Sequence, residues 1–88
     1  MRRPIEIVNE LGLHARAAAR FVELANRFQS KVELKRDGET VDGKSILGIL
    51  TLAAPRGTRL VLVTDGPDES EAMDALEALI MDRFGEER

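Results

Sequence analysis

The order in which two kinds of hydrophobic spacing follow one another constrains the fold of this chain more than any other feature of its sequence. In some segments apolar residues alternate with polar ones, as they do in half-buried strands. In others they recur every three or four residues, which places them on one face of a helix. The strand-like segments are residues 5–8, 31–35, 39–42 and 59–64, and the helix-like segments are residues 15–28 and the stretch from the turn at 65–69 to Gly85.

The segment 46–52 is apolar throughout, and its composition alone fits a strand. Ser45 directly before it is a favoured N-cap residue, and apolar side chains crowd every side, so we predict a short helix instead. A hairpin turn is predicted at Asp37-Gly38. The resulting order is strand–helix–strand–strand–helix–strand–helix. An α+β architecture, with helices on one face of a mostly antiparallel sheet, suits this order.

The length of the chain and its content of Cys and His restrict the available chemistry. With 88 residues the chain fits one domain over residues 1–88 and is too short to wall a deep cleft. It has no Cys and one His, which excludes disulfides, a thiol nucleophile and Cys-based or His-rich metal sites. No calcium-loop spacing is present either. We therefore expect no metal site and no cofactor.

Charge is distributed unevenly along the chain. Residues 1–59 carry 11 Lys and Arg against 7 Asp and Glu, a balance of +4, whereas residues 60–88 carry 2 against 9, a balance of −7. The basic part suits an anionic ligand, but the few aromatic residues and the lack of a basic stripe argue against nucleic-acid binding. No apolar run indicates a membrane span or a signal peptide, so we expect a cytoplasmic protein. We also expect residues 86–88 to be frayed and the acidic part to lie away from any anion site.

His14 lies where a loop is predicted to become the first helix. The first backbone N–H groups of a helix have no partner inside it and lie at the positive end of the helix dipole, so an anion beside His14 would meet free donors. Arg16 can offer a charged fork to the same anion. A neutral imidazole there can accept a phosphoryl group. The alternative, which the spacing alone favours, is that His14 is an ordinary loop or N-cap residue and Arg16 a solvated one.

Three further groups of residues allow more than one interpretation. Ser45 is a predicted N-cap, although a phosphate on it would be tolerated at a positive helix end beside Lys44. The side chains of Ile46, Leu47 and Leu50 cannot all face inward in so short a helix, so they form an exposed docking patch unless the sheet covers most of them. Carboxylates before and within the start of the last helix are interpreted as helix-start and solubility features: Asp65, Asp68, Glu69 and Glu71.

Three motifs in this order resemble the histidine-containing phosphocarrier (HPr) family. Gly12–Arg16, read Gly-Leu-His-Ala-Arg, resembles the phosphorylation-site motif of that family. Lys44–Leu50 resembles its regulatory-serine segment, and Gly66–Ala72 resembles the start of its final helix. Each motif alone has limited specificity, but together, at these separations and in a chain of this length, they make a specific match from about residue 5 to residue 84.

The resemblance implies an open-faced β-sandwich with a four-stranded antiparallel sheet and three helices on one side, in the order βαββαβα. It implies a carrier in the phosphoenolpyruvate-dependent phosphotransferase system, which is itself phosphorylated rather than turning over a small molecule. Enzyme I would phosphorylate His14 at the ring nitrogen nearer the backbone, and His14 would pass the group to a IIA domain. Arg16, with the backbone of Ala15 and Ala17, would hold the phosphoryl group.

The resemblance also implies a regulatory site and a docking face. Ser45 would be the residue that a dedicated HPr kinase/phosphorylase modifies in some relatives. Enzyme I and the IIA domains would share one docking face on a protein that we expect to be a monomer. That face would comprise Ala19, Arg20, Ile46, Leu47 and Leu50.

One residue departs from the family pattern. The family usually has Pro after the Arg of the site motif, and this chain has Ala17. Ala is a strong helix former, so the helix should survive, and its N–H adds a donor for phosphate. The motifs leave open whether the chain is a sugar-transport carrier or a nitrogen-related paralogue. Two alternatives to a carrier are a regulatory binding module that controls a partner protein and an interaction domain that has lost phosphotransfer.

Overall fold

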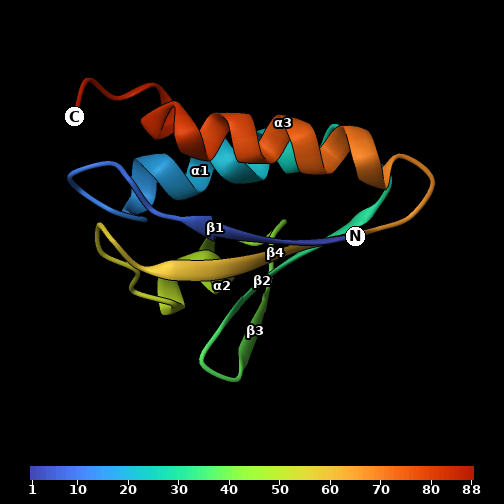
Figure 1. Ribbon diagram of the computed structural model, residues 1–88, viewed down its shortest axis with the longest axis horizontal. Helices are drawn as coiled ribbons and strands as arrows, with labels where there is room; N and C mark the ends of the chain where they lie inside the picture. The colour runs from blue at the N-terminus through green and yellow to red at the C-terminus, as the bar shows by residue number, and fades with distance from the viewer.

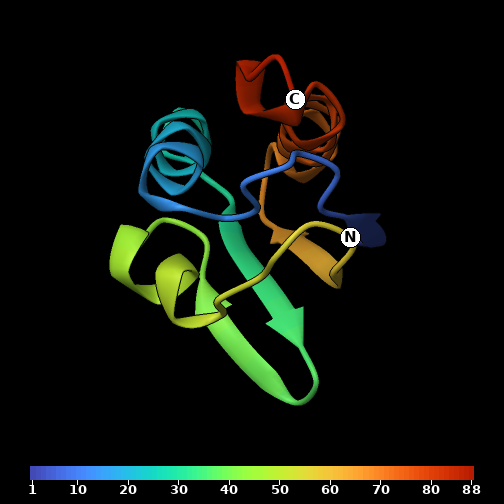
Figure 2. The same ribbon diagram turned by 90° about the vertical axis from the view of Figure 1, so that its left-hand side faces the viewer.

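All seven predicted elements are present in the computed structural model, which describes residues 1–88 (Figure 1). In chain order they are β1 (Arg2–Glu6), α1 (Ala15–Ala25), β2 (Lys31–Arg36), β3 (Glu39–Asp42), α2 (Ile46–Thr51), β4 (Arg59–Asp65) and α3 (Glu69–Met81), followed by a short 3-10 helix, η1 (Arg83–Gly85). The strands form one antiparallel sheet in the order β1–β4–β2–β3. All three helices lie on one side of this sheet (Figure 2). The predicted α+β fold is therefore confirmed.

Two element boundaries differ from the predicted ones. α1 ends at Ala25 instead of Phe28, because the chain tightens there and the Phe28 N–H donates to the Ala25 carbonyl at 3.2 Å. Phe28 is consequently only half-buried. β1 occupies residues 2–6 rather than 5–8, since its partner strand β4 begins at Arg59 and the ladder between them stops there.

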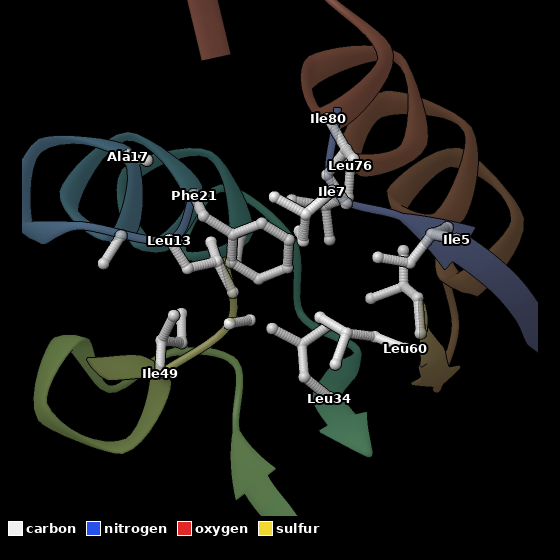
Figure 3. Packing of buried hydrophobic residues seen from close by; sticks show 14 of the residues in the cluster. Ile5, Ile7, Leu13, Ala17, Phe21, Leu34, Ile49, Leu60, Leu76 and Ile80 are labelled. Carbon is white, nitrogen blue, oxygen red and sulfur yellow. The ribbon is translucent and has the colours of Figure 1, made fainter. Parts of the chain in front are cut away.

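Alternate residues of β1, β2 and β4 face the helices and form the core. Leu34 lies opposite Leu62, and Ile5 lies opposite Leu60, and all four are buried. Phe21 of α1 points between the helices and the sheet and touches both layers (Figure 3). The 19 buried residues of the core form a single cluster. This packing fixes α1, and therefore its first turn, against the sheet.

The segment after Ser45 forms the short helix α2. The prediction of a helix is therefore confirmed, although the composition of the segment also fits a strand. The Ser45 hydroxyl accepts a hydrogen bond from the Gly48 N–H at 3.0 Å, as an N-cap does. Ile49 is buried against the core, whereas Ile46 and Leu47 are exposed. The apolar residues of α2 thus divide between the core and the surface.

Asp68 has a different role from the helix-start feature that the sequence predicts. It directly precedes α3 but makes no side-chain cap. Its carboxylate accepts hydrogen bonds from the Ser30 hydroxyl at 2.5 Å and from the N–H groups of Gln29 and Ser30, each at 2.9 Å. The Ser30 hydroxyl, followed by these N–H groups, holds the pKa of Asp68 below its ordinary value. Asp68 therefore ties the start of α3 to the segment before β2.

This clamp predicts a pH-dependent contribution of Asp68 to stability. Because the pKa is lower in the folded chain than in the unfolded one, the contribution is complete above the ordinary aspartate pKa of about 4 and is lost as the pH falls below it. The Asp68→Asn variant should be less stable than the wild type at neutral pH, and the difference should shrink in acid. Urea unfolding at neutral and acidic pH measures it, with the exposed Asp65→Asn as control. A difference that does not change with pH would contradict the clamp.

Candidate functional site

His14 is the N-cap residue of α1. Its backbone is extended, with φ −81° and ψ 179°, and its ring Nδ1 accepts a hydrogen bond from the Arg16 N–H at 3.3 Å. Gly12 precedes it with φ 69°, and a Cβ at that position would lie 2.5 Å from the Ala54 carbonyl oxygen. The next residue, Leu13, is buried and donates its N–H to the same carbonyl at 2.9 Å. The loop is thereby anchored, and the half-exposed ring of His14 is held at the helix start.

The first turn of α1 presents polar groups to the surface. Ala15 and Arg16 are exposed, and Ala17 turns its methyl group into the core, where it is fully buried. The N–H groups of this turn have no partners within the helix. The helix begins at Ala15 although Ala17 stands where Pro is usual, so the expectation that the helix survives this substitution is confirmed. The structure thus places the three predicted phosphate-holding residues, Ala15, Arg16 and Ala17, in the helical turn that directly follows His14.

Glu86 is part of this site, and the sequence analysis missed it. One of its carboxylate oxygens lies 2.5 Å from Nε2 of His14, and the other accepts a hydrogen bond from the Asn9 amide at 3.0 Å. The prediction that residues 86–88 are frayed is therefore wrong for Glu86, as is the placing of all the acidic residues away from the site. At the chain end, the carbonyl of Arg88 accepts from the Glu10 N–H at 3.1 Å.

A turn after α3 brings Glu86 to His14. The predicted last helix continues to Gly85, but α3 ends at Met81, and Arg83, Phe84 and Gly85 have φ values of 56°, 54° and 80°. Phe84 remains buried, as predicted, and its carbonyl accepts from the Arg20 guanidinium. After these left-handed residues the chain ends at the end of the molecule where α1 begins (Figure 1). A glycine after an apolar stripe signals that a helix ends, but nothing local indicates where the chain then goes.

Opposing effects act on the Glu86 carboxylate. Its burial raises its pKa, but the hydrogen bonds from Asn9 and His14 and the charges of His14 and Arg20 outweigh burial, so the pKa lies below its ordinary value. The side chain keeps 10% of its exposure. Glu86 therefore lies beside His14 as an ionised carboxylate near neutral pH.

An open cavity of about 500 Å³ adjoins this site. Basic and acidic side chains line it in equal number, and its open shape is as expected of a chain too short for a deep cleft. The lining residues are Glu10, Leu11, Arg16, Arg20, Gly85, Glu86, Glu87 and Arg88. No group of three or more His, Asp and Glu side chains is placed to hold a metal ion. Nor does any helix combine the length and apolar character that a membrane span requires.

The predicted docking residues lie on two neighbouring helices. α2 packs beside α1 (Figure 2), and its residues Leu47 and Ile46 keep 75% and 41% of their exposure. Leu50 is half-buried, as are Ala19 and Arg20 on α1. The patch is therefore exposed at its α2 end, which supports the docking interpretation over the alternative that the sheet covers most of the patch. Exposure alone does not establish a partner.

The surroundings of Ser45 differ from the expected ones in one respect. Ser45 caps α2 and is half-buried. The Lys44 ammonium group, expected beside a phosphate on Ser45, instead donates to the Phe28 carbonyl at 2.8 Å. This contact ties the turn before α2 to the segment that follows α1. A phosphate on Ser45 would have to compete with that carbonyl for the charge of Lys44.

Comparisons with known proteins agree on one family. The family profile described as "PTS HPr component phosphorylation site" matches residues 1–82. A phosphocarrier protein HPr from Cupriavidus necator is 56% identical over 86 residues, which cover 98% of this chain and 97% of that protein. One from Neisseria meningitidis is 50% identical over 86 residues, with the same coverage.

The fold agrees as well. The crystal structure of an HPr from Thermoanaerobacter tengcongensis superposes with a TM-score of 0.96 at 44% identity, covering 100% of this chain and 99% of that one. Sequence, profile and fold all match over nearly the whole length of the chain. The chain therefore belongs to the HPr family, the phosphocarrier proteins of the phosphotransferase system, which are phosphorylated on a histidine.

Proposed function

We propose that His14 carries the phosphoryl group and that Nδ1 is the atom that accepts it. It is the only histidine of the chain. The observation that best supports this assignment is the position of His14 at the N-cap of α1, with Nδ1 facing the Arg16 N–H at 3.3 Å. A phosphoryl group on Nδ1 lies at the positive end of the helix, where its negative charge is stabilised.

The first turn of α1 then holds the phosphoryl oxygens. The N–H groups of Ala15, Arg16 and Ala17 point toward the helix start, and the exposed Arg16 guanidinium can move to the same oxygens. Phosphoryl transfer passes through a loose transition state, so positioning and charge stabilisation account for most of the catalysis. The additional N–H of Ala17 serves as a donor where the family usually has Pro.

The partners follow from membership of the phosphotransferase system. Enzyme I donates the phosphoryl group and a IIA domain receives it, both by docking on the exposed side chains of Ile46 and Leu47 with the neighbouring Leu50, Ala19 and Arg20. The protein works in the cytoplasm as a monomer in which residues 1–88 act as one unit. Ser45 is the position for regulation by a kinase/phosphorylase.

The test of this function is phosphorylation of the wild-type chain. The protein is incubated with phosphoenolpyruvate and enzyme I from the same cell, and acid-labile phosphate is measured. We expect up to one phosphoryl group per chain, which is transferred on when a IIA domain is added. Absence of label with an enzyme I that phosphorylates another HPr would refute the carrier function and favour a binding module.

A charge at Ser45 should weaken docking. Asp is as good an N-cap as Ser, so Ser45→Asp should keep α2 while placing a carboxylate beside the exposed Ile46 and Leu47. We expect binding to enzyme I to weaken about tenfold, or about 1.4 kcal/mol. Isothermal titration calorimetry measures it, with Ser45→Thr as the uncharged cap control. Equal affinity for the two variants would place the docking face elsewhere.

A further inference from the structure

The imidazole ring of His14 is held from two sides by groups of opposite hydrogen-bonding character. On one side the Arg16 N–H, which can only donate, faces Nδ1 at 3.3 Å. On the other side the Glu86 carboxylate, which only accepts when ionised, lies 2.5 Å from Nε2. A neutral imidazole has one N–H, and only the tautomer with that hydrogen on Nε2 satisfies both neighbours.

We propose that Glu86 is a positioning residue for phosphoryl transfer, which keeps the proton of His14 on Nε2 and so leaves Nδ1 unprotonated for attack on phosphorus. This inference rests on the proposed role of His14 as the acceptor. Glu86 does not touch the phosphoryl group; it acts through the ring. The lowered pKa of its carboxyl is consistent with an acceptor that stays ionised near neutral pH.

The Glu86 carboxylate is itself fixed by a buried side chain. The amide nitrogen of Asn9 donates to Glu86 at 3.0 Å and to the Gly12 carbonyl at 2.8 Å, and Asn9 is fully buried. Both of these partners accept hydrogen bonds, so the amide is held with its nitrogen toward them. Its oxygen is left buried without a partner, an arrangement that costs about 1–3 kcal/mol. Asn9 thus links the loop before His14 to the carboxylate that orients the ring.

The backbone conformation of the residues before Glu86 is also energetically unfavourable. Arg83 and Phe84 are non-glycine residues with φ near 55°, a region that costs an L-residue about 1–2 kcal/mol. Burial of Phe84 and the hydrogen bond from Arg20 to its carbonyl hold them there. Arg83 additionally donates from Nε to the Glu86 carbonyl at 3.4 Å. The carboxylate is consequently presented to His14 by a defined turn and not by a loose chain end.

The proposed contact between Glu86 and His14 lets the ring receive the phosphoryl group and pass it on without moving a proton. When the lone pair of Nδ1 forms the N–P bond, the bond between phosphorus and the donor atom breaks, and its electron pair leaves with the donor. The ring keeps its Nε2 proton and becomes a cation, whose charge the Glu86 carboxylate balances. When the acceptor attacks phosphorus, the N–P electron pair returns to Nδ1 and restores the same neutral tautomer.

The experiment compares variants at Glu86 with a matched variant at Glu87, an exposed neighbour of the same charge. Two-bond ¹H–¹⁵N spectra at neutral pH identify the His14 tautomer in the unphosphorylated protein. Steady-state kinetics with enzyme I as donor give kcat and KM. We expect the wild type and Glu87→Ala to hold the Nε2–H tautomer. Glu86→Ala should populate both tautomers and lower kcat about tenfold, with KM changed less than about twofold.

A second variant guards against a loss of structure at the turn. Glu86→Gln keeps the size of the side chain, but its amide can donate to Nε2, so the proton should move in part to Nδ1. An unchanged tautomer in Glu86→Gln, or an unchanged kcat despite a changed tautomer, would overturn the proposal. The tautomer measurement needs no phosphorylation. If wild-type His14 holds the Nε2–H tautomer but takes no phosphate, the carrier function has failed and not the contact with Glu86.

Discussion

Replacing His14 with Ala is expected to abolish acid-labile phosphorylation of this protein by enzyme I and phosphoenolpyruvate. The chain has no second histidine and no cysteine, so it offers no other imidazole or thiol nucleophile to accept the phosphoryl group. The fold should persist, because the bond from the Arg16 N–H to the ring is long and exposed, and loss of an N-cap costs about 1 kcal/mol. Label is measured after incubation, and folding is followed by urea unfolding.

The His14→Asn variant separates the role of His14 as phosphoryl acceptor from its role as the N-cap of α1. Asn is a strong N-cap residue but has no nucleophilic nitrogen, so this variant should match the wild type in stability and still take no label. Label that persists in either variant would place the phosphoryl group on another residue. Loss of label together with unfolding of both variants would make the role of His14 structural.

The Arg16→Ala variant is expected to slow phosphoryl transfer about a hundredfold while the chain stays folded. A guanidinium at the phosphoryl oxygens offsets charge in the transition state, and removal of one such donor costs about 10²–10³ in rate. Arg16 is exposed and its side chain makes no hydrogen bond or ion pair in the fold, so stability should change by less than about 0.5 kcal/mol. Rapid-quench transfer from phosphorylated enzyme I measures the rate.

Two further variants show whether charge or geometry matters at this position. Arg16→Lys keeps the charge but not the planar fork, and should recover part of the rate. Arg27→Ala removes an exposed arginine just beyond the far end of α1 and should transfer at the wild-type rate. Equal rates for Arg16→Ala and the wild type would remove Arg16 from the phosphate site, and equal losses at both positions would indicate a general effect of net charge.

The fold could be predicted from the sequence because its signals are local. The alternation through β2 and β4 and the spacing of Phe21, Val22 and Ala25 on α1 each reflect burial on one face, and these residues are buried as predicted. Ser45 is the residue that favours a helix over a strand for the segment that follows it, and its N-cap hydrogen bond to α2 is present. In each case a few residues that are neighbours in the sequence are enough to explain why the helix or strand forms.

The candidate site could be predicted only on its α1 side. His14 and Arg16 are two residues apart, so the helix start that joins them can be recognised locally. Glu86 is separated from His14 by 72 positions and from Asn9 by 77, and it reaches them only because η1 turns through left-handed residues after α3. The same holds for Asp68, which bonds to Ser30 from 38 positions away rather than capping its own helix. Contacts between distant segments depend on the assembled fold and have no local pattern.

The closeness of the chain end to His14 has a practical consequence for the design of fusion proteins. A purification tag or fluorescent label joined after Arg88 would begin beside the loop that carries Glu10, at the same end of the molecule as the start of α1 (Figure 1). Such an extension would crowd the route by which enzyme I reaches the ring. The N-terminus lies toward the opposite end of the sheet (Figure 1), and a tag attached there, or cleaved away before assay, leaves that route open.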